Sequence, residues 1–400
     1  MRVSTSQIYA LGAESIGRTQ ADLLRTQQQI AAMRRILTPS DDPVGSATAV
    51  GVRQSQAGVD RHDASIGVAK DALGQYDSTL TSIVTLLQNA RTTTVNAGNG
   101  TLNDADRGAL ATQLSQQLDQ LIGLANSKDG QGNSMFAGFN VGAQAFVKTA
   151  SGVVYNGDSG VRSLEVGAGR SMPVSMAGDA LFLANPTGNG RFVASAAPAN
   201  TGGAVVGTTQ AVGALDGHSY TVTFNVSGGV TTYDVYDVTT AASVSTGNAY
   251  TDGQAITVAG MQFTASGAPA SGDVVNLAPA SRQSVFDTLS GIVAALKLPA
   301  GDAATRAALA NRLGEGLSNL DQALENVMTH QAQGGAQLSE LDALSGLNSD
   351  RSVAYAKTLS GIEDLDYTKA TSDFAKQQLA LEAAQKSFLS VTGLSLFNEM

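Results

Sequence analysis

The sequence predicts a multidomain protein of mixed α and β structure. Long N- and C-terminal helices pair as a coiled coil and a helical bundle, and a β-rich middle domain is inserted between them. Three observations lead to this prediction. Both ends of the chain carry apolar residues at alternating spacings of three and four, and longer stretches with the same spacing lie inside them. Between residues 134 and 282 the chain changes to short apolar segments separated by glycine.

The N-terminal stripe occupies the first forty residues. Its large apolar side chains recur at intervals of seven, at Tyr9, Ile16, Leu23, Ile30 and Leu37. A stripe this narrow is typical of a coiled-coil seam rather than of the broad buried face of a globular helix. Pro39 and Pro43 interrupt it, and Ser40, Asp41 and Asp42 between them are suited to begin a second helix.

A matching stripe runs through residues 366–400. Its large apolar members are Tyr367, Phe374, Leu381, Phe388 and Val391, and the residues between them are largely Lys, Gln, Ser, Glu and Thr. We call these five residues and the five N-terminal ones the terminal seam. Two matching stripes at opposite ends of one chain predict that the ends lie side by side and antiparallel, with the rest of the chain looped out from them.

The next part of the N-terminal half reads as helix. No proline lies between Val44 and Met172. We call its first unbroken stripe the inner seam, and it predicts one helix of about 30 residues. Glycines at 98 and 100 end that helix, and Asn103, Asp104 or Asp106 can cap the next, which ends near Asp129. The inner seam consists of Ile66, Ala69, Leu73, Tyr76, Leu80, Ile83, Leu87 and Ala90, and the stripe after it of Leu110, Leu114, Leu118, Leu121 and Leu124.

Helical spacing returns after residue 283. Residues 285–296 form a short amphipathic segment closed by Pro299. A long stripe follows, which Gly334 and Gly335 weaken. Its members are Leu309, Leu313, Leu317, Leu320, Leu324, Val327, Leu338, Leu341 and Leu344.

The middle of the chain reads as strands and turns. Alternating apolar residues from Tyr220 are followed by Gly228 and Gly229 and then by a second β-rich run through Val238, which predicts a hairpin. Together these patterns divide the chain into three parts. Residues 1–40 with 366–400 form a terminal coiled-coil assembly domain, residues 41–133 with 283–365 a helical bundle domain, and residues 134–282 a β-rich variable domain that can split near residue 191.

The composition limits the classes of partner. The net charge is −10, from 24 Lys and Arg against 34 Asp and Glu, which argues against nucleic acid or an anionic membrane as partner. The chain has no cysteine, so disulfides and thiolate metal sites are excluded. No apolar run is long enough for a membrane span. Residues 1–15 lack the apolar core of a secretory signal, which favours a cytoplasmic protein or export without a cleaved signal.

The sequence offers no credible catalytic, metal or cofactor site. Asp41 and Asp42 could serve acid–base chemistry or a metal, but a helix cap is the favoured interpretation. The residues around Ser159 resemble the setting of a serine-protease nucleophile. Such a nucleophile needs a neighbouring base, and the three histidines, His62, His218 and His330, are dispersed along the chain. A polar turn is therefore the favoured interpretation there.

Four stretches of the sequence carry a resemblance to a known family. TPSDDPVG at 38–45, NSMFAGF at 133–139, GVVYNGD at 152–158 and SLF at 395–397 resemble motifs of the flagellin superfamily. Within that superfamily the first motif is similar to that of the hook-associated proteins, because true flagellins have Asp-Asp-Ala-Ala-Gly there. The resemblance covers roughly residues 1–185 and 283–400.

The resemblance implies a non-enzymatic structural subunit of the bacterial flagellum, needed for filament assembly and motility. The implied location is extracellular, in a ring at the hook–filament junction that is reached by flagellar type III export. Implied partners are copies of the chain, hook-associated protein 1, flagellin and a flagellar export chaperone, with no cofactor. One alternative is a flagellin-type filament subunit, against which Pro39 and Pro43 stand. A more remote one is an exported protease or adhesin on a coiled-coil stalk.

Small and polar residues dilute the stripes at both ends. Gly12, Thr19, Thr26 and Gln377 occupy positions where a strong coiled coil has leucine or isoleucine. An isolated pair of such helices is weak, because few apolar contacts offset the backbone entropy lost on folding. We therefore expect both ends to be poorly ordered in the free monomer and to fold against neighbouring copies.

Overall fold

The computed structural model describes the backbone of residues 5–397 and the side chains of residue 7 and residues 9–390. The chain divides into two compact units, which are described separately below. One unit comprises residues 1–64 with 343–400, and the other comprises residues 65–342. Two long helices, α2 (Pro43–Ala97) and α5 (Ala303–Glu363), contribute residues to both units.

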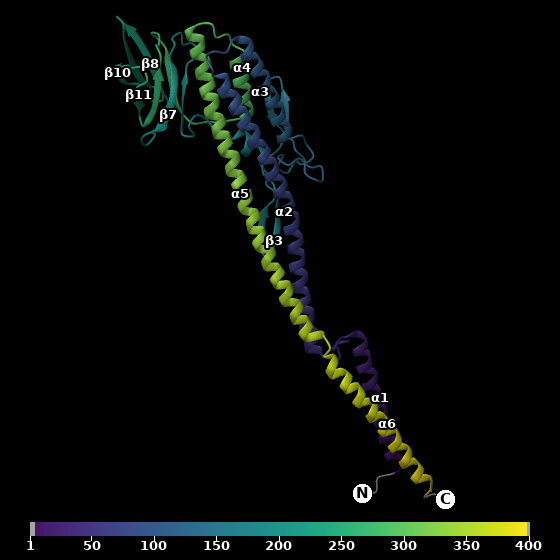
Figure 1. Cartoon of the computed structure of the whole chain (residues 1–400). Helices are drawn as coiled ribbons and strands as arrows, with labels where there is room; N and C mark the ends of the chain where they lie inside the picture. Colours follow the sequence, from purple (N-terminus) through teal and green to yellow (C-terminus); the bar gives the residue numbers. More distant parts are fainter. Residues whose placement is uncertain (1–4, 398–400) are drawn as a thin grey trace. The chain divides into compact units, whose positions relative to one another are not determined.

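The unit that contains the chain ends is helical. Helix α1 (Thr5–Ala32) lies alongside α6 (Tyr367–Phe397), as Figure 1 shows. The two helices are antiparallel, because an antiparallel bridge joins Arg34 to Asp364 where α1 ends and α6 is about to begin. Helix α1 ends at Ala32, where Met33 takes a left-handed backbone conformation with φ of 52°.

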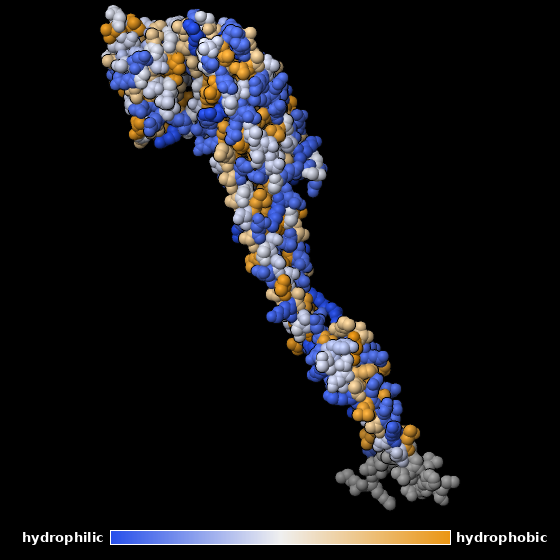
Figure 2. Space-filling view, viewed as in Figure 1, coloured by the Kyte–Doolittle hydropathy of each residue, from blue (hydrophilic) through white to orange (hydrophobic). Residues whose placement is uncertain are grey.

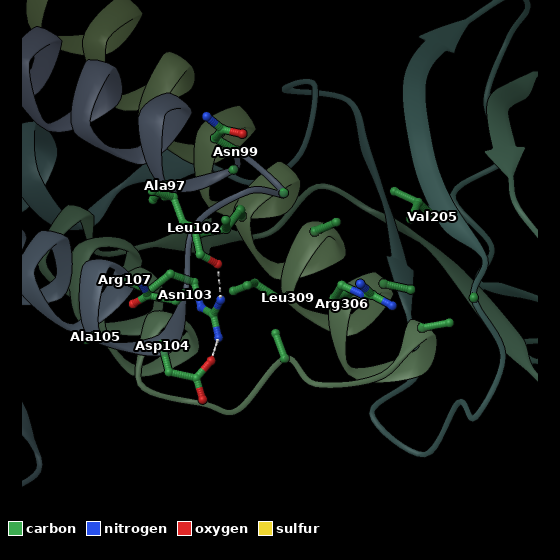
Figure 3. A pocket seen from close by; sticks show the side chains of 18 residues that line it. Ala97, Asn99, Leu102, Asn103, Asp104, Ala105, Arg107, Val205, Arg306 and Leu309 are labelled. Atoms are coloured by element: carbon green, nitrogen blue, oxygen red, sulfur yellow. Dashed lines mark hydrogen bonds and ion pairs between the residues drawn. The ribbon is translucent and has the colours of Figure 1, made fainter.

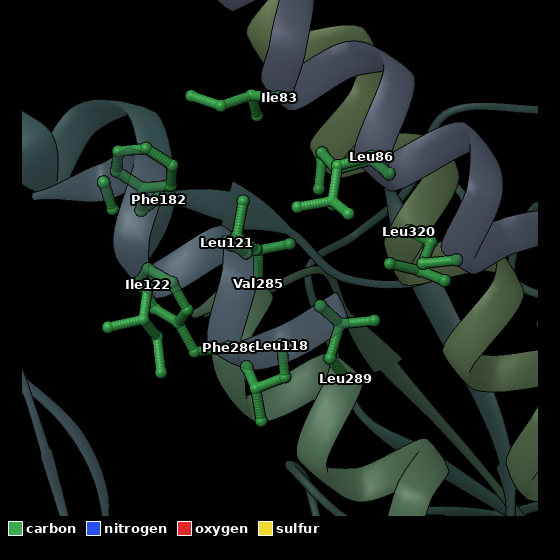
Figure 4. Close-up of a cluster of buried hydrophobic side chains, with 14 of the residues drawn as sticks. Ile83, Leu86, Leu118, Leu121, Ile122, Phe182, Val285, Phe286, Leu289 and Leu320 are labelled. Atoms are coloured by element: carbon green, nitrogen blue, oxygen red, sulfur yellow. The ribbon is translucent and has the colours of Figure 1, made fainter. Parts of the chain in front are cut away.

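In the larger unit α2 and α5 pack with two shorter helices, α3 (Asp104–Ala125) and α4 (Val285–Leu296). Local sequence explains where these begin. The side chain of Asn103 accepts a hydrogen bond from the backbone N–H of Asp106, and the carboxylate of Asp106 accepts one from the backbone N–H of Asn103, which completes a capping box. Ser284 caps α4 in the same position. Figure 4 shows how Leu118 and Leu121 of α3 face Val285 and Leu289 of α4 within the buried cluster.

Short β segments pack around this helical core. They are β1 (Phe146–Thr149) paired with β2 (Gly152–Tyr155), β3 (Ser163–Gly167) with β4 (Arg170–Pro173), and β5 (Asn185–Pro186) with β14 (Arg282–Gln283), together with the single-turn π-helix η1 (Asp179–Leu183). Their aromatic side chains join the helical core. The ring of Phe146 lies 5.1 Å from the rings of both Phe182 and Phe286, measured between ring centroids.

The remaining strands form two antiparallel sheets around a second buried cluster. The five-stranded sheet has the order β10–β9–β8–β13–β6, and the three-stranded sheet has the order β11–β12–β7. The strands are β6 (Phe192–Ala196), β7 (Val205–Ala211), β8 (Tyr220–Ser227), β9 (Val230–Asp237), β10 (Ala242–Ala249), β11 (Ala255–Val258), β12 (Met261–Ser266) and β13 (Val274–Pro279). Both sheets contribute to the cluster, with Phe224 from the first and Phe263 from the second completely buried.

The predicted fold class is confirmed, and so is the hairpin. Strands β8 and β9 pair in register around Gly228 and Gly229, whose φ values of 57° and 78° fit the tight turn that such hairpins require. The three-part domain division stays a prediction. Its split near residue 191 falls between the two buried clusters, because residues 135–182 contribute to the helical core and residues 192–277 form the second cluster.

One helix length and one helix limit differ from prediction. Helix α2 is 55 residues long rather than about 30, because it runs unbroken to Ala97 from Pro43, where Asp42 caps the predicted helix start. Helix α5 continues through Gly334 and Gly335 as its stripe predicts, and packing on either side offsets the cost of about 1 kcal/mol for each glycine. Helix α3 ends at Ala125 rather than near Asp129, because the side chain of Asn126 turns to exchange two hydrogen bonds with the backbone of Phe146.

Candidate assembly surface

The terminal seam lies along the contact between α1 and α6. On α1 the predicted positions Tyr9, Ile16, Leu23 and Ile30 are half-buried, and most residues between them are exposed. On α6 the half-buried positions repeat at three and four, at Phe374, Gln377, Leu381, Ala384 and Phe388. The predicted periodicity therefore coincides with the partly buried positions of the two helices, and the assembly role of these residues stays a prediction.

Three members of the terminal seam do not fit this description. Leu37 is half-buried but lies beyond the end of α1, in the connection to α2, so the helical stripe ends at Ile30. Tyr367 is the first residue of α6 and is 58% exposed. Val391, like the SLF motif at 395–397, lies outside the residues whose side chains are described.

Two contacts fix the register of this helix pair. The rings of Tyr9 and Phe388 meet edge to face, with centroids 6.1 Å apart. At the other end the backbone N–H of Leu365 donates to the carbonyl of Met33 over 3.3 Å. In an antiparallel pair these two contacts place Leu23 at about the level of Phe374.

The small and polar residues that interrupt the two terminal stripes differ in their surroundings. A side chain at Gly12 would place its Cβ 2.8 Å from Cδ2 of Phe388, so glycine makes room for the ring. Thr26 is buried, and its hydroxyl donates to the carbonyl of Asp22 over 3.0 Å, which satisfies it within its own helix. Gln377 differs, because its buried Oε1 has no hydrogen-bond partner among the described residues.

Large apolar side chains also lie outside the seam. Leu11 and Leu24 of α1 are 58% and 53% exposed, and Leu379 of α6 is 70% exposed. Figure 2 shows hydrophobic side chains on the visible surface of this helix pair. Each helix therefore covers only one face of the other, and apolar surface remains around the pair.

The turn at Pro39–Pro43 uses its two carboxylates differently. Oδ1 of Asp42 accepts a hydrogen bond from the N–H of Gly45 over 2.8 Å and caps α2, with Pro43 at the first helical position. Asp41 faces backward instead, and its Oδ2 accepts from the N–H groups of Leu37 and Thr38 over 2.9 Å each. These backbone hydrogen bonds lower the pKa of both carboxyls. The predicted capping role is correct for Asp42, whereas Asp41 caps the preceding turn.

Two further members of the motif, Pro39 and Ser40, complete this turn. The hydroxyls of Ser40 and Thr38 are 2.7 Å apart and share a hydrogen bond. Arg25 of α1 reaches the same turn, with its Nη2 2.8 Å from Oδ1 of Asp41. The motif thus ties the end of α1 to the start of α2.

A charged cluster beside this turn was missed by the sequence analysis. Glu363, the last residue of α5, is 8% exposed, and both its carboxylate oxygens lie 2.5 Å from Nη2 of Arg53. Arg34 approaches the same carboxylate at 3.2 Å. Arg35 donates its backbone N–H to the carbonyl of Glu363 and its Nη2 to the carbonyl of Ile362, both over 2.7 Å. The adjacent arginines 34 and 35 beside the proline motif were the available signal.

The histidines and Ser159 lie in separate settings. His62 is half-buried on α2, and His218 precedes β8, where its Nδ1 lies 2.8 Å from Oδ2 of Asp237. His330 lines a cavity of about 340 Å³ together with Ser159 and Asp179. The hydroxyl of Ser159, however, bonds to the carboxylate of Asp179 and to no histidine among the described residues. A serine nucleophile needs the opposite order, with the histidine next to the hydroxyl.

Neither a membrane-crossing helix nor a metal-binding cluster occurs among the described residues. None of the helices there combines the length and hydrophobicity that a bilayer crossing requires. Within the same part of the chain, no group of three or more His, Asp or Glu side chains is placed to hold a metal ion.

The fold and this surface define a class of proteins in which the two chain ends pair as antiparallel helices and a β-rich region is inserted between long helices. Residues 3–141 match the bacterial flagellin N-terminal helical region. Over 401 residues the chain is 28% identical to flagellar hook-associated protein 3 of Escherichia coli, which covers 99% of both chains.

Solved structures of related proteins also match this chain. The crystal structure of FlgL from Xanthomonas campestris matches with a TM-score of 0.71 and 32% identity, covering 77% of this chain and 99% of that one. The flagellar junction protein FlgL from Legionella pneumophila matches with a TM-score of 0.73 and 30% identity, covering 79% of this chain and all of that one. The chain belongs to the flagellar hook-associated protein 3 family, within the flagellin superfamily.

Proposed function

We propose that this chain is a structural subunit of the flagellum that forms a ring at the hook–filament junction, between hook-associated protein 1 and flagellin. Support comes from the names of its relatives, which describe a hook-associated and a junction protein. These relatives align over most or all of the chain, which favours the junction role over a filament subunit. The proposed location is extracellular, with export by the flagellar route and without a cleaved signal peptide.

The observation that carries an assembly role is the incomplete burial of the terminal seam. In the α1–α6 pair the large apolar seam residues are at best half-buried, and Leu11, Leu24 and Leu379 are exposed. The buried oxygen of Gln377 adds an unmet hydrogen bond, which destabilises the pair by about 1–3 kcal/mol if it stays unmet. Copies of the same helices from neighbouring subunits supply both the apolar cover and a donor for Gln377.

Limited proteolysis tests whether the ends fold on assembly. We expect protease treatment of the purified monomer to remove both ends and to stop near Ser40 and near Asp366, as read by mass spectrometry. The physical reason is that few apolar contacts offset the roughly 1–2 kcal/mol of backbone entropy per residue. Ends that resist the protease while residues 192–280 are cut first would contradict coupled folding.

A matched pair of variants tests the seam itself. Leu381→Asp places a carboxylate in the contact between the helices, where removing the charge from water costs several kcal/mol. We expect it to abolish assembly and motility while the larger unit stays folded. Gln378→Asp puts the same charge on an exposed position of the same helix and should assemble normally. Equal motility of the two variants would contradict a role of the terminal seam in assembly.

A deletion strain tests the place in the flagellum. Loss of the protein should abolish motility, leave hooks intact and release unpolymerised flagellin into the medium. Filaments of normal length in that strain would contradict the junction role.

We assign the chain no catalytic role. Replacing His62, His218 and His330 together by glutamine should leave motility near normal, because none of them is placed as a base beside a nucleophile. Hydrolysis of casein by the wild-type protein that disappears in this triple variant, or in Ser159→Ala, would overturn the assignment and favour the protease alternative.

A further inference from the structure

A cavity of about 890 Å³ lies where the helical core meets the three-stranded sheet. Its walls are the α2–α3 turn, the first turns of α5 and the chain that leads into β7, as Figure 3 shows. It contains no residue of the terminal seam or of the proline turn. The volume falls within the range of roughly 300–1,000 Å³ that is usual for small-molecule sites.

The sheet and the helical core hold this cavity open. The side chain of Asn311 on α5 accepts a hydrogen bond from the N–H of Val206 over 2.7 Å and donates one to the carbonyl of Ala204 over 3.0 Å. This bridge fixes the start of β7 against α5. Alanines supply much of the wall between them, so no large side chain fills the space.

One wall carries a buried cation. Arg107 of α3 is 5% exposed, and its guanidinium donates Nη1 to the carbonyl of Leu102 and Nη2 to Asp104. Its Nε has no hydrogen-bond partner among the described residues. Figure 3 shows the guanidinium between Asp104 and Leu309. Because that Nε is itself inaccessible and Asp104 already pairs with the guanidinium, Arg107 shapes this wall and offers no free donor to a ligand.

A second cation lies on the opposite wall. The Nε of Arg306 on α5 donates to the carbonyl of Asp302 over 3.1 Å, and no carboxylate of the described residues pairs with its guanidinium. Asp104 is the single acidic residue that lines the cavity, against two arginines. The guanidinium of Arg306 is exposed and hydrogen-bonds to no carboxylate among the described residues, although Asp302 attracts it electrostatically, so Arg306 is the group that favours an anionic ligand.

The rest of the lining is apolar, including Leu102, Leu309, Leu313 and Val205. We propose that this cavity binds a small amphipathic anion, with an apolar body against the leucines and one carboxylate or sulfonate held by Arg306. Guanidinium groups suit such acids, because they form paired charged hydrogen bonds with them.

The probe for the test is 1-anilinonaphthalene-8-sulfonate, which combines an aromatic body with one sulfonate. Its uncharged relative, N-phenyl-1-naphthylamine, measures the apolar contribution alone. We expect saturable binding of the sulfonate by the full-length protein and competition by decanoate. The uncharged probe should bind about tenfold more weakly, the ratio that corresponds to one charged contact of about 1.4 kcal/mol.

Two variants and two matched controls locate the binding. Ala310→Phe fills the cavity and should abolish saturable binding, whereas Ala308→Phe, on an exposed position outside the lining, should retain it. Arg306→Gln should weaken sulfonate binding about tenfold and leave the uncharged probe unaffected. Arg312→Gln removes an exposed arginine of the same helix outside the cavity and should change neither.

All four substitutions avoid the buried Arg107, and thermal unfolding checks that each variant is folded. Equal binding by Ala310→Phe and Ala308→Phe would overturn the proposal, since the dye would then be held elsewhere. Equal effects of Arg306→Gln and Arg312→Gln on sulfonate binding would contradict the proposal that the ligand is an anion. Non-saturable fluorescence in the wild type would contradict a site altogether.

Discussion

The inner seam of α2 and the terminal seam of α1 and α6 have the same spacing of apolar residues but different depths of burial. All eight residues of the inner seam are buried, and Ile66, Leu80 and Leu87 are each 1% exposed. In the terminal seam Leu23, Phe374 and Leu381 are only half-buried. Spacing therefore predicts which face a helix buries, and the number of elements packed against that face decides how completely it is buried.

The physical difference between the two regions is the number of partners. From Tyr76 to Ala90, α2 packs in one buried cluster with α3, α4, α5 and the phenylalanines of the short β segments. Helices α1 and α6 chiefly contact each other. A two-helix contact leaves the flanks of every seam residue open to solvent or to another subunit. The inner seam thus serves folding of the monomer, and we propose that the terminal seam serves assembly.

The largest expected effect compares the same substitution in the two seams. Leu80→Ala should cost about 2–5 kcal/mol in the unfolding of the larger unit, because it opens a cavity among fully packed neighbours. Leu381→Ala should cost about 1 kcal/mol or less in the monomer, since that side chain is only partly buried there. Urea unfolding followed by circular dichroism measures both, and equal losses would remove the distinction.

A second prediction concerns the charged cluster at the end of α5. Glu363→Gln leaves Arg53 and Arg34 without their shared carboxylate and should cost about 2–3 kcal/mol in the smaller unit. The control is Glu340→Gln, which breaks the pair with Arg170 between two more exposed side chains and should cost under about 1 kcal/mol. Thermal unfolding of both variants, together with the rate of proteolysis near residue 40, measures the two losses of stability. A larger effect at 340 would show that burial of Glu363 is unimportant.

A third prediction compares two glycines of α1. Gly12→Ala places a methyl group 2.8 Å from the ring of Phe388 and should destabilise the helix pair by about 1–2 kcal/mol. Gly17→Ala meets no atom within 4 Å and should stabilise α1 by about 0.5–1 kcal/mol, through helix propensity alone. We expect Gly12→Ala to raise the rate of proteolysis of α1 and Gly17→Ala to lower it. Shifts of the same sign would contradict close packing at Gly12.

The smallest expected effect is a pH dependence in the sheets, which belong to neither seam. The hydrogen bond to Asp237 raises the pKa of His218 above its usual range. Burial acts to raise the pKa of Asp237, but hydrogen bonds from Thr240, His218 and Thr239 outweigh it and lower that pKa to about 2.

The stabilisation from His218 is therefore fully present below the unfolded-state pKa of about 6.5 and is lost as the pH rises through the higher folded value. We expect the melting temperature of the sheets to fall modestly from pH 6 to pH 8, and His218→Gln should flatten that slope. His62→Gln is the control, because His62 has no carboxylate partner among the described residues. An unchanged slope in His218→Gln would contradict the contribution of this pair.

Elements whose signals are local could be predicted from the sequence. The inner seam, the cap at Asn103 and the hairpin at Gly228 follow from periodicity and turn chemistry within a few residues. The sequence also predicted the antiparallel pairing of the ends, because two matching stripes in one chain satisfy each other most simply. The motifs that resemble those of the hook-associated proteins could also be recognised in the sequence, because each is a short contiguous run of residues.

The tertiary structure alone decided what depends on residues far apart in the chain. It separated the roles of Asp41 and Asp42, brought Arg34 and Arg53 to Glu363, and joined Ser159 to Asp179 rather than to His330. It also enclosed the cavity beside Arg107 between α5 and β7. Periodicity records which face of an element is apolar, but the depth of burial and the partners of a charge depend on which elements the folded chain brings against that face.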